Sequence, residues 1–217
     1  MNRPDFEASL TALIATFAVL VGVSITDYLD PEKTPIPSAY FWWVFIMMIA
    51  LMLRYIVGSA IHLKYMYGNR LPDLPRSRSA CLFFKDGAFL VWFGALAVGM
   101  AHAWEKAANP ADRFAHFPEG LDSFFRHAEL FLTAGIAWSV TDCVIRYVYS
   151  MRAGRANEWP DNAPWSFWLI VDLMQLYLTF AVPQVVGSPL AAVRILAPVY
   201  VVLLYVDFEH SVRTLRG

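Results

Sequence analysis

The stretch from Trp165 to Val182 sets the strongest limit on how this chain can fold. Its residues are almost all apolar, and its length suits the hydrocarbon core of a bilayer, which takes about 20 helical residues to cross. Yet Asp172 lies inside it. An ionisable residue within a spanning segment usually faces protein or water and is a candidate for function. The stretch therefore predicts a transmembrane helix with a buried carboxylate.

Five further apolar stretches of similar length occur along the chain. Together they predict spans at about residues 9–26, 40–63, 81–104, 127–149, 165–182 and 190–208. The chain is 58% hydrophobic and 16% charged, whereas a typical soluble domain is about 45–50% apolar and about 25% charged. No part is long and polar enough to form a separate soluble domain. The sequence thus predicts an all-α, polytopic membrane protein that forms a single bundle of six transmembrane helices.

Turn and loop residues divide these spans. Within the longest loop we expect a short interfacial helix near residues 121–125. Between the last two spans, Pro183, Gly187 and Pro189 predict a short turn.

Basic residues are distributed unevenly between the two ends of the predicted spans. With an even number of spans, both termini and two long loops lie on one side of the membrane. That side holds 11 of the 17 basic residues: Arg3, Lys64, Arg70, Arg76, Arg78, Lys85, Arg146, Arg152, Arg155, Arg213 and Arg216. The other side holds Lys33, Lys106, Arg113, Arg126 and Arg194. Because cytoplasmic loops carry the excess of Lys and Arg, this predicts a multipass protein of the cell inner membrane with both termini cytoplasmic.

Polar residues within the spans fall into one layer of the predicted bundle. Trp168, Asp172, Gln175 and Thr179 share one face of a helix because they are four, three and four residues apart. Arg54 lies deep in the second span, and its long side chain can extend toward the inner half of the membrane. The predicted ion pathway or buried polar network comprises Arg54, His62, Asp86, Asp142, Arg146, Asp172, Gln175 and Asp207.

Two interpretations of this layer stay open. In the structural one, Arg54 contacts Asp172 directly, through Gln175 or through water, and removing either charge should be worse than removing both. The remaining carboxylates then lie near helix ends and reach water, and Asp142 pairs with Arg146 four residues on. In the functional one, the layer lines a water-filled path for cations or protons.

The chain carries no sequence signature of an enzyme or of a cofactor site. His-Glu-x-x-His, Gly-x-Ser-x-Gly and a phosphate-binding loop are all absent from it. His116, His127 and Glu129 do not have the spacing of a standard metal site. No run of five or more basic residues indicates a nucleic-acid partner. We therefore expect no enzyme, no metal, no cofactor and no nucleic acid.

The segment from Phe84 to Phe89, Phe-Lys-Asp-Gly-Ala-Phe, looks slightly like a potassium-channel signature. That signature, Phe-Ser-Asp-Gly-x-Phe, belongs to a lysosomal and bacterial family with six spans per repeat. There it lies in the first span with an arginine upstream. Here it lies in the third span, and a lysine replaces the serine. We therefore do not assign the chain to that family and carry over no residue role.

The leading functional interpretation is an oligomeric ion channel or a proton- or ion-coupled transporter in the lipid bilayer. Ala95 with Gly99, and Ala97 with Ala101, permit close helix contact and favour a homo-oligomer. The alternative is a non-conducting sensor or anchoring subunit, of the envelope-stress or defence type. Such a subunit would dock a cytosolic protein partner on the basic inner loops.

Overall fold

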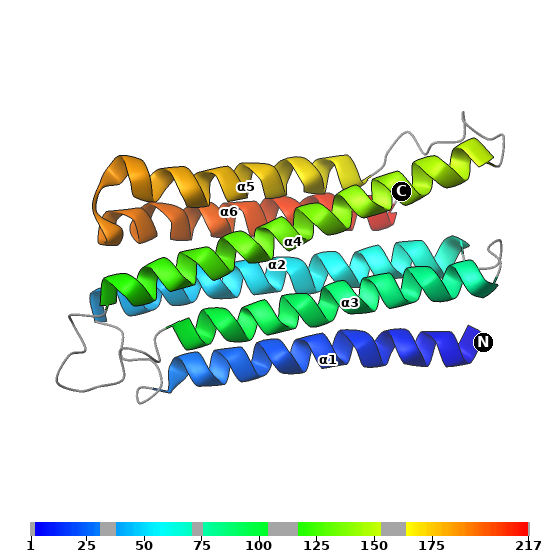
Figure 1. The fold of residues 1–217 in the computed structure, drawn as a ribbon, viewed down its shortest axis with the longest axis horizontal. Coiled ribbons are helices and arrows are strands. Elements are labelled where there is room, and N and C mark those ends of the chain that lie inside the picture. Colours follow the sequence, from blue (N-terminus) through cyan, green and yellow to red (C-terminus); the bar gives the residue numbers. More distant parts are fainter. Residues whose placement is uncertain (1–2, 31–37, 71–75, 104–116, 153–163, 217) are drawn as a thin grey trace.

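The computed structural model is an all-helical bundle and describes residues 3–30, 38–70, 76–103, 117–152 and 164–216 (Figure 1). Each helix contains a stretch long and apolar enough to cross a membrane. The predicted all-α fold with six candidate spans is confirmed, and it fits a multipass membrane protein. The helices are α1 (Arg3–Leu29), α2 (Ser38–Arg70), α3 (Arg76–Ala101), α4 (Phe117–Arg152), α5 (Pro164–Val186) and α6 (Pro189–Arg216).

The main helix contacts close a ring. Its order is α1, α3, α4, α5, α6, α2 and back to α1, and α4 crosses obliquely in front of α2 (Figure 1). Within its candidate span, 50% of α2 is buried, a larger share than in any other helix. Side chains on α2 are therefore well placed to contact the opposite helices.

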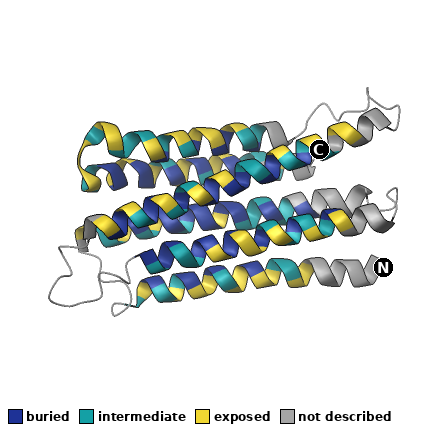
Figure 2. Ribbon diagram, in the orientation of Figure 1, coloured by how far each residue is buried: buried dark blue, intermediate teal, exposed yellow. Residues whose placement is uncertain are grey.

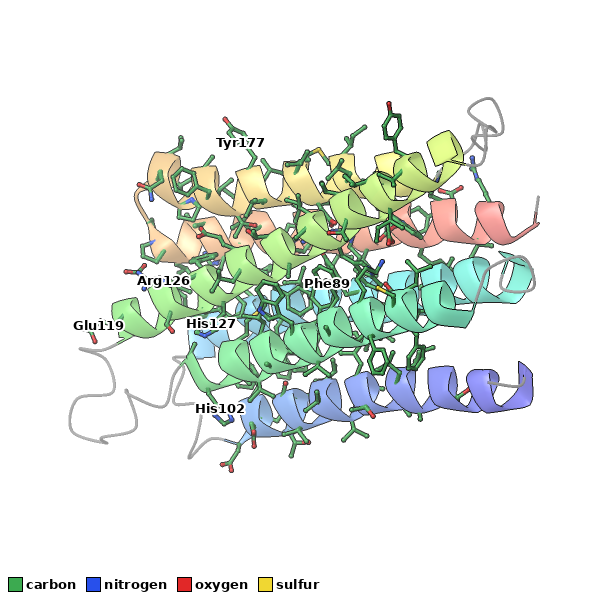
Figure 3. All side chains as sticks on the ribbon, turned by 45° about the vertical axis from the view of Figure 1, so that its right-hand side comes forward. Phe89, His102, Glu119, Arg126, His127 and Tyr177 are labelled. Atoms are coloured by element: carbon green, nitrogen blue, oxygen red, sulfur yellow. The ribbon has the colours of Figure 1, made fainter. Side chains whose placement is uncertain are left out.

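Successive helices run in opposite directions. The start of α1 and the end of α6 lie at one end of the bundle, with the ends of α2 and α4 and the starts of α3 and α5 (Figure 1). The even number of spans inferred from the sequence agrees with this arrangement. At the other end, Nε2 of His102, the residue directly after α3, lies 2.8 Å from Asp27 Oδ2 of α1 (Figure 3).

Aromatic side chains fill the centre of the bundle. The ring of Phe93 on α3 is fully buried, and its centroid lies 4.8 Å from that of Tyr55 on α2 and 4.9 Å from that of Phe131 on α4. Phe89 stacks on Trp138 of α4 at 5.9 Å (Figure 3). Aromatic pairs at such distances contribute about 0.5–1.5 kcal/mol each beyond the area they bury. This core holds α2, α3 and α4 together around one aromatic cluster.

Apolar side chains also cover the outside of the bundle. Exposed residues lie along the outward faces of the helices (Figure 2), and Tyr177 points outward from α5 with 68% of its surface exposed (Figure 3). Val185 and Phe84 are similarly exposed. A surface this apolar suits contact with lipid, since soluble proteins rarely expose large contiguous apolar patches.

Several helices extend beyond the predicted spans. The second continues to Arg70, and the fourth begins at Phe117 instead of near residue 127. The separate interfacial helix expected near residues 121–125 is therefore the first part of α4, which corrects that prediction. These added helical turns are more polar than the apolar stretches from which the spans were predicted. The helices therefore continue beyond the residues that could lie in the hydrocarbon core.

The turn between α5 and α6 is shorter than predicted. Pro183 lies inside α5, and the helix ends at Val186. Gly187 has a φ of +64°, the left-handed conformation that ends many helices and that glycine adopts without strain. The Ser188 hydroxyl accepts a hydrogen bond from the Ala191 amide at 3.5 Å, and Pro189 opens α6. These residues let two antiparallel helices meet through a minimal connection.

Candidate functional site

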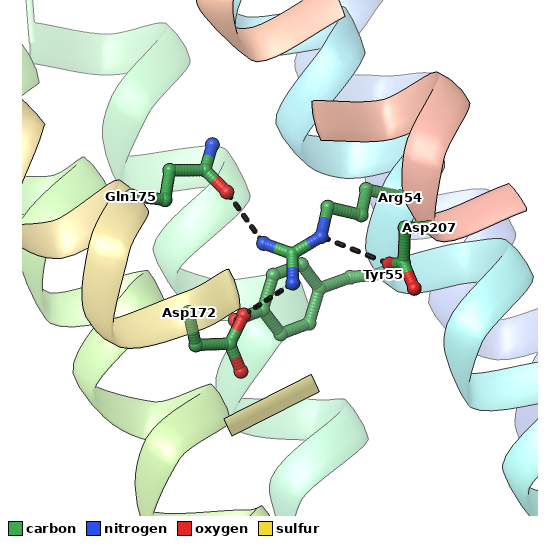
Figure 4. A network of polar contacts seen from close by, with 5 residues as sticks. All are labelled: Arg54, Tyr55, Asp172, Gln175 and Asp207. Carbon is green, nitrogen blue, oxygen red and sulfur yellow. Dashed lines mark hydrogen bonds and ion pairs between the residues drawn. The ribbon is translucent and has the colours of Figure 1, made fainter. Parts of the chain in front are cut away.

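Arg54 of α2 forms the centre of a buried polar cluster with α5 and α6 (Figure 4). Its Nη2 lies 2.6 Å from Asp172 Oδ1, and its Nε lies 2.9 Å from Asp207 Oδ2. Its Nη1 donates to Gln175 Oε1 at 2.5 Å. All four residues are at least 95% buried. Of the predicted forms of contact between Arg54 and Asp172, the structure shows the direct one.

Tyr55 extends this cluster toward α4. Its hydroxyl donates to Asp172 Oδ1 at 3.0 Å, while its ring packs against Phe93 and Phe131. A Cβ atom at position 135 of α4 would overlap the Tyr55 hydroxyl and lie 2.7 Å from two of its ring carbons. Gly135 is therefore the residue that lets Tyr55 reach Asp172.

The predicted polar face of α5 turns into the protein. Trp168, Asp172, Gln175 and Thr179 are all buried. The Thr179 hydroxyl donates to the Gln175 carbonyl at 2.7 Å and lies 2.6 Å from the Tyr200 hydroxyl of α6. This face thus joins α5 to both α2 and α6.

A second polar cluster lies between α3 and α4. Lys85 Nζ is 2.8 Å from Asp86 Oδ1 and also forms an ion pair with Asp142. Trp138 Nε1 donates to Asp86 Oδ1 at 2.7 Å. Both carboxylates are buried, and the Lys85 side chain is 14% exposed.

The two clusters have the same balance of charge. We define the Arg54 cluster as Arg54, Asp172 and Asp207, and the Lys85 cluster as Lys85, Asp86 and Asp142. Each has one basic residue and two carboxylates, so each carries a formal charge of -1 when all its members are ionised. A buried charge without compensation is costly, so each cluster favours a proton or a cation.

A pocket lies between the two clusters. Its free volume is about 50 Å³, and about 10–15 Å³ is enough to hold one water. The pocket therefore has room for a few water molecules. Its lining comprises Arg54, Tyr55, Gly58, Ser59, Gly135, Trp138, Ser139, Asp142, Trp168, Asp172 and Asp207.

The structure places most of the predicted network in these two clusters. Arg54, Asp172, Gln175 and Asp207 form one group, and Asp86 and Asp142 belong to the other. The side chains of His62 and Arg146 lie outside the described residues, so the predicted pairing of Arg146 with Asp142 stays a prediction.

The expectation that three carboxylates reach water from helix ends is wrong. Asp86, Asp142 and Asp207 are 0%, 2% and 5% exposed. Their helices continue past them by two or more turns, so these positions are interior. Tyr55, Trp138 and Ser59 were not predicted as site residues, and Lys85 was counted only among the basic residues of the cytoplasmic side. The only sequence feature that could have placed Lys85 in the buried cluster is that it directly precedes Asp86.

Among the described residues, no group of three or more His, Cys, Asp or Glu side chains is arranged to hold a metal ion. Of the three residues considered for a metal in the sequence, His127 has its Nδ1 2.8 Å from the Ser123 carbonyl oxygen. His116 lies outside the described residues.

Comparisons with models of known families, with curated proteins and with solved structures find no match.

Proposed function

We propose that this protein conducts or carries protons or small cations across a cell inner membrane, as a channel or a coupled transporter. The observation that carries the proposal is the pocket between the two clusters. Rings and clusters of carboxylates select cations in membrane pores, and intramembrane carboxylates relay protons. Both termini face the cytoplasm in this proposal, which places the shared end of α2 and α4 on the cytoplasmic side. The proposal includes a homo-oligomer, although Ala97 and Ala101 are buried within a single bundle and do not serve contact between copies.

The clusters are suited to exchange charge. Each holds two carboxylates against one basic residue, so each can gain or release one positive charge while retaining one ion pair. Together they involve five of the six helices. A change in the charge of the pocket therefore bears directly on how these helices pack.

A flux assay in liposomes tests this proposal. Purified protein is reconstituted with a pH-sensitive dye inside, and fluxes of protons, Na⁺ and K⁺ are recorded under imposed gradients. Asp142→Asn removes one carboxylate from the pocket lining and should abolish most of the flux. Lys85 keeps its contact with Asp86, so the fold should persist.

The matched control is Asp122→Asn on the same helix. Asp122 is exposed and is remote from the pocket lining, so this variant should retain wild-type flux. Wild-type protein that passes neither protons nor cations would refute the proposal, as would equal flux in both variants.

The second candidate function is a non-conducting membrane subunit that docks a cytosolic protein partner. Three nitrogens of Arg54 already bind Asp172, Asp207 and Gln175. This favours the second function, because such a network also serves to hold helices together. A stable partner captured on the intact protein, combined with absent flux, would decide for this alternative.

A further inference from the structure

Two oxygen atoms in the pocket between the clusters lack hydrogen-bond partners. Ser59 Oγ and Asp207 Oδ1 have none within 3.5 Å among the described residues, although the indole of Trp168, which also lines the pocket, interacts with the Asp207 carboxylate. Ser59 is 2% exposed and Asp207 is 5% exposed, and both residues line the pocket. A buried polar atom left without a partner is strongly disfavoured, so both atoms favour a ligand inside the pocket.

The charge around the pocket indicates the sign of that ligand. Asp207 uses Oδ2 for Arg54, which leaves Oδ1 for another group. Arg54 is itself shared with Asp172. Asp142, from the Lys85 cluster, lies on the pocket wall as well. Carboxylates thus outnumber basic residues on both sides, and a cation is the ligand that reduces this imbalance.

We propose that the pocket binds one small monovalent cation, with Asp207 Oδ1 and Ser59 Oγ as its protein ligands. Carboxylate and hydroxyl oxygens are the ligands that hard cations prefer. The free volume of about 50 Å³ holds the ion with a few waters that complete its coordination. This site rests on the proposed function, for which it supplies the transported or coupling ion.

The geometry favours a monovalent cation over the other candidates. A proton would neutralise one carboxylate and leave Ser59 Oγ to water alone, whereas a hydrated ion would offer a ligand contact to both oxygens. A divalent ion generally takes several carboxylate ligands, and no group of three such residues is arranged for a metal in the described part of the chain.

Thermal unfolding of the full-length protein in detergent tests the site without any transport step. Li⁺, Na⁺, K⁺ or NH₄⁺ chloride is titrated at constant ionic strength against choline chloride, whose cation is too large for the pocket. At least one small cation should raise the Tm by several degrees in a saturable manner, because ligands that bind only the folded state stabilise it.

Two variants locate the effect. Ser59→Ala removes one ligand oxygen and should abolish most of the cation-dependent rise in Tm, and Ser59→Thr should restore it by retaining the hydroxyl. Ser24→Ala is the matched control, because Ser24 is fully buried in α1 and donates to the Leu20 carbonyl. That control should keep the full cation response.

Three results would overturn the site: a Tm that is the same in all five salts, a Tm that responds to pH alone, or a cation response unchanged in Ser59→Ala. Failure of the site and failure of the proposed function are distinguishable. Saturable stabilisation without flux in liposomes would preserve the site and remove the transport role. Flux without cation-specific stabilisation would preserve the transport role and remove the site.

Discussion

Replacing Arg54 should destabilise the protein more than replacing any of its partners. Arg54→Leu leaves two carboxylates, Asp172 and Asp207, buried without a cation, and the formal charge of the cluster falls to -2. Removing one partner of a buried ion pair costs about 3–5 kcal/mol. Arg54 serves two such pairs, at 2.6 and 2.9 Å. We therefore expect a loss of stability at or above the upper end of that range.

Asp172→Leu should have a smaller effect. Arg54 keeps its ion pair with Asp207 and its hydrogen bond to Gln175, so the cluster becomes formally neutral. The Tyr55 hydroxyl loses its carboxylate acceptor, and a buried donor left unpaired costs about 1–3 kcal/mol. We expect a loss of about that size.

The double substitution distinguishes pairing from mere proximity. Arg54→Leu with Asp172→Leu leaves only Asp207 uncompensated, so it should be more stable than Arg54→Leu alone but less stable than Asp172→Leu alone. This corrects the simpler expectation that either single change is worse than both. The coupling energy should then exceed the loss in Asp172→Leu, which is about 1–3 kcal/mol, and so lie at or above the upper part of the range for residues of one network. Adding Asp207→Asn should recover further stability.

The assay is unfolding of the purified variants by SDS in mixed micelles, with free energies compared across the complete cycle. Single-variant effects that add to within about 0.5 kcal/mol would refute the pairing. So would an Asp172→Leu variant that is as unstable as Arg54→Leu, since the argument from residual charge requires that order.

Three further predictions follow from the same structure. Gly135→Ala should lower stability by about 1–3 kcal/mol through overpacking against the Tyr55 hydroxyl, and Tyr55→Phe should reduce that penalty when combined with it; thermal unfolding of the four proteins measures both. Lys85→Met should lower the yield of folded protein on size-exclusion chromatography far more than Lys85→Arg, because it leaves two buried carboxylates without a cation. After removal of the two native cysteines, an impermeant thiol reagent applied outside cells should label cysteine at position 111 but not at position 74; labelling at 74 would reverse the orientation.

The sequence predicted the central contact because few residues compete for it. Arg54 is the only basic residue at mid-span depth, and Asp172 is the carboxylate deepest in an apolar stretch, so burial requires that each find a partner. The face shared by Asp172 and Gln175 follows from helical periodicity alone. The depth of a residue in a span and the face that it occupies both follow from the residues of a single helix, so the sequence alone is enough to predict them.

What the sequence did not predict depends on packing between helices. The apolar stretch of the last span stops near Asp207, which predicts a helix end there, but α6 continues to Arg216. The choice of Lys85 as partner of Asp142 depends on how α3 lies against α4. The ring order, in which α2 neighbours α6, is likewise a property of the assembled bundle. Ser59 offered no signal, since a lone serine in an apolar helix is common.

The partners of Arg54 also impose an order on biosynthesis. In a chain that enters the membrane helix by helix, α2 arrives second, but Asp172 and Asp207 belong to α5 and α6, the last two helices. A lone arginine at the centre of a membrane helix carries an insertion penalty of about 2.5–3.5 kcal/mol. Lys85, in contrast, meets Asp142 as soon as the next helix follows. A nascent chain that stops before α5 would therefore hold Arg54 without either of its carboxylate partners.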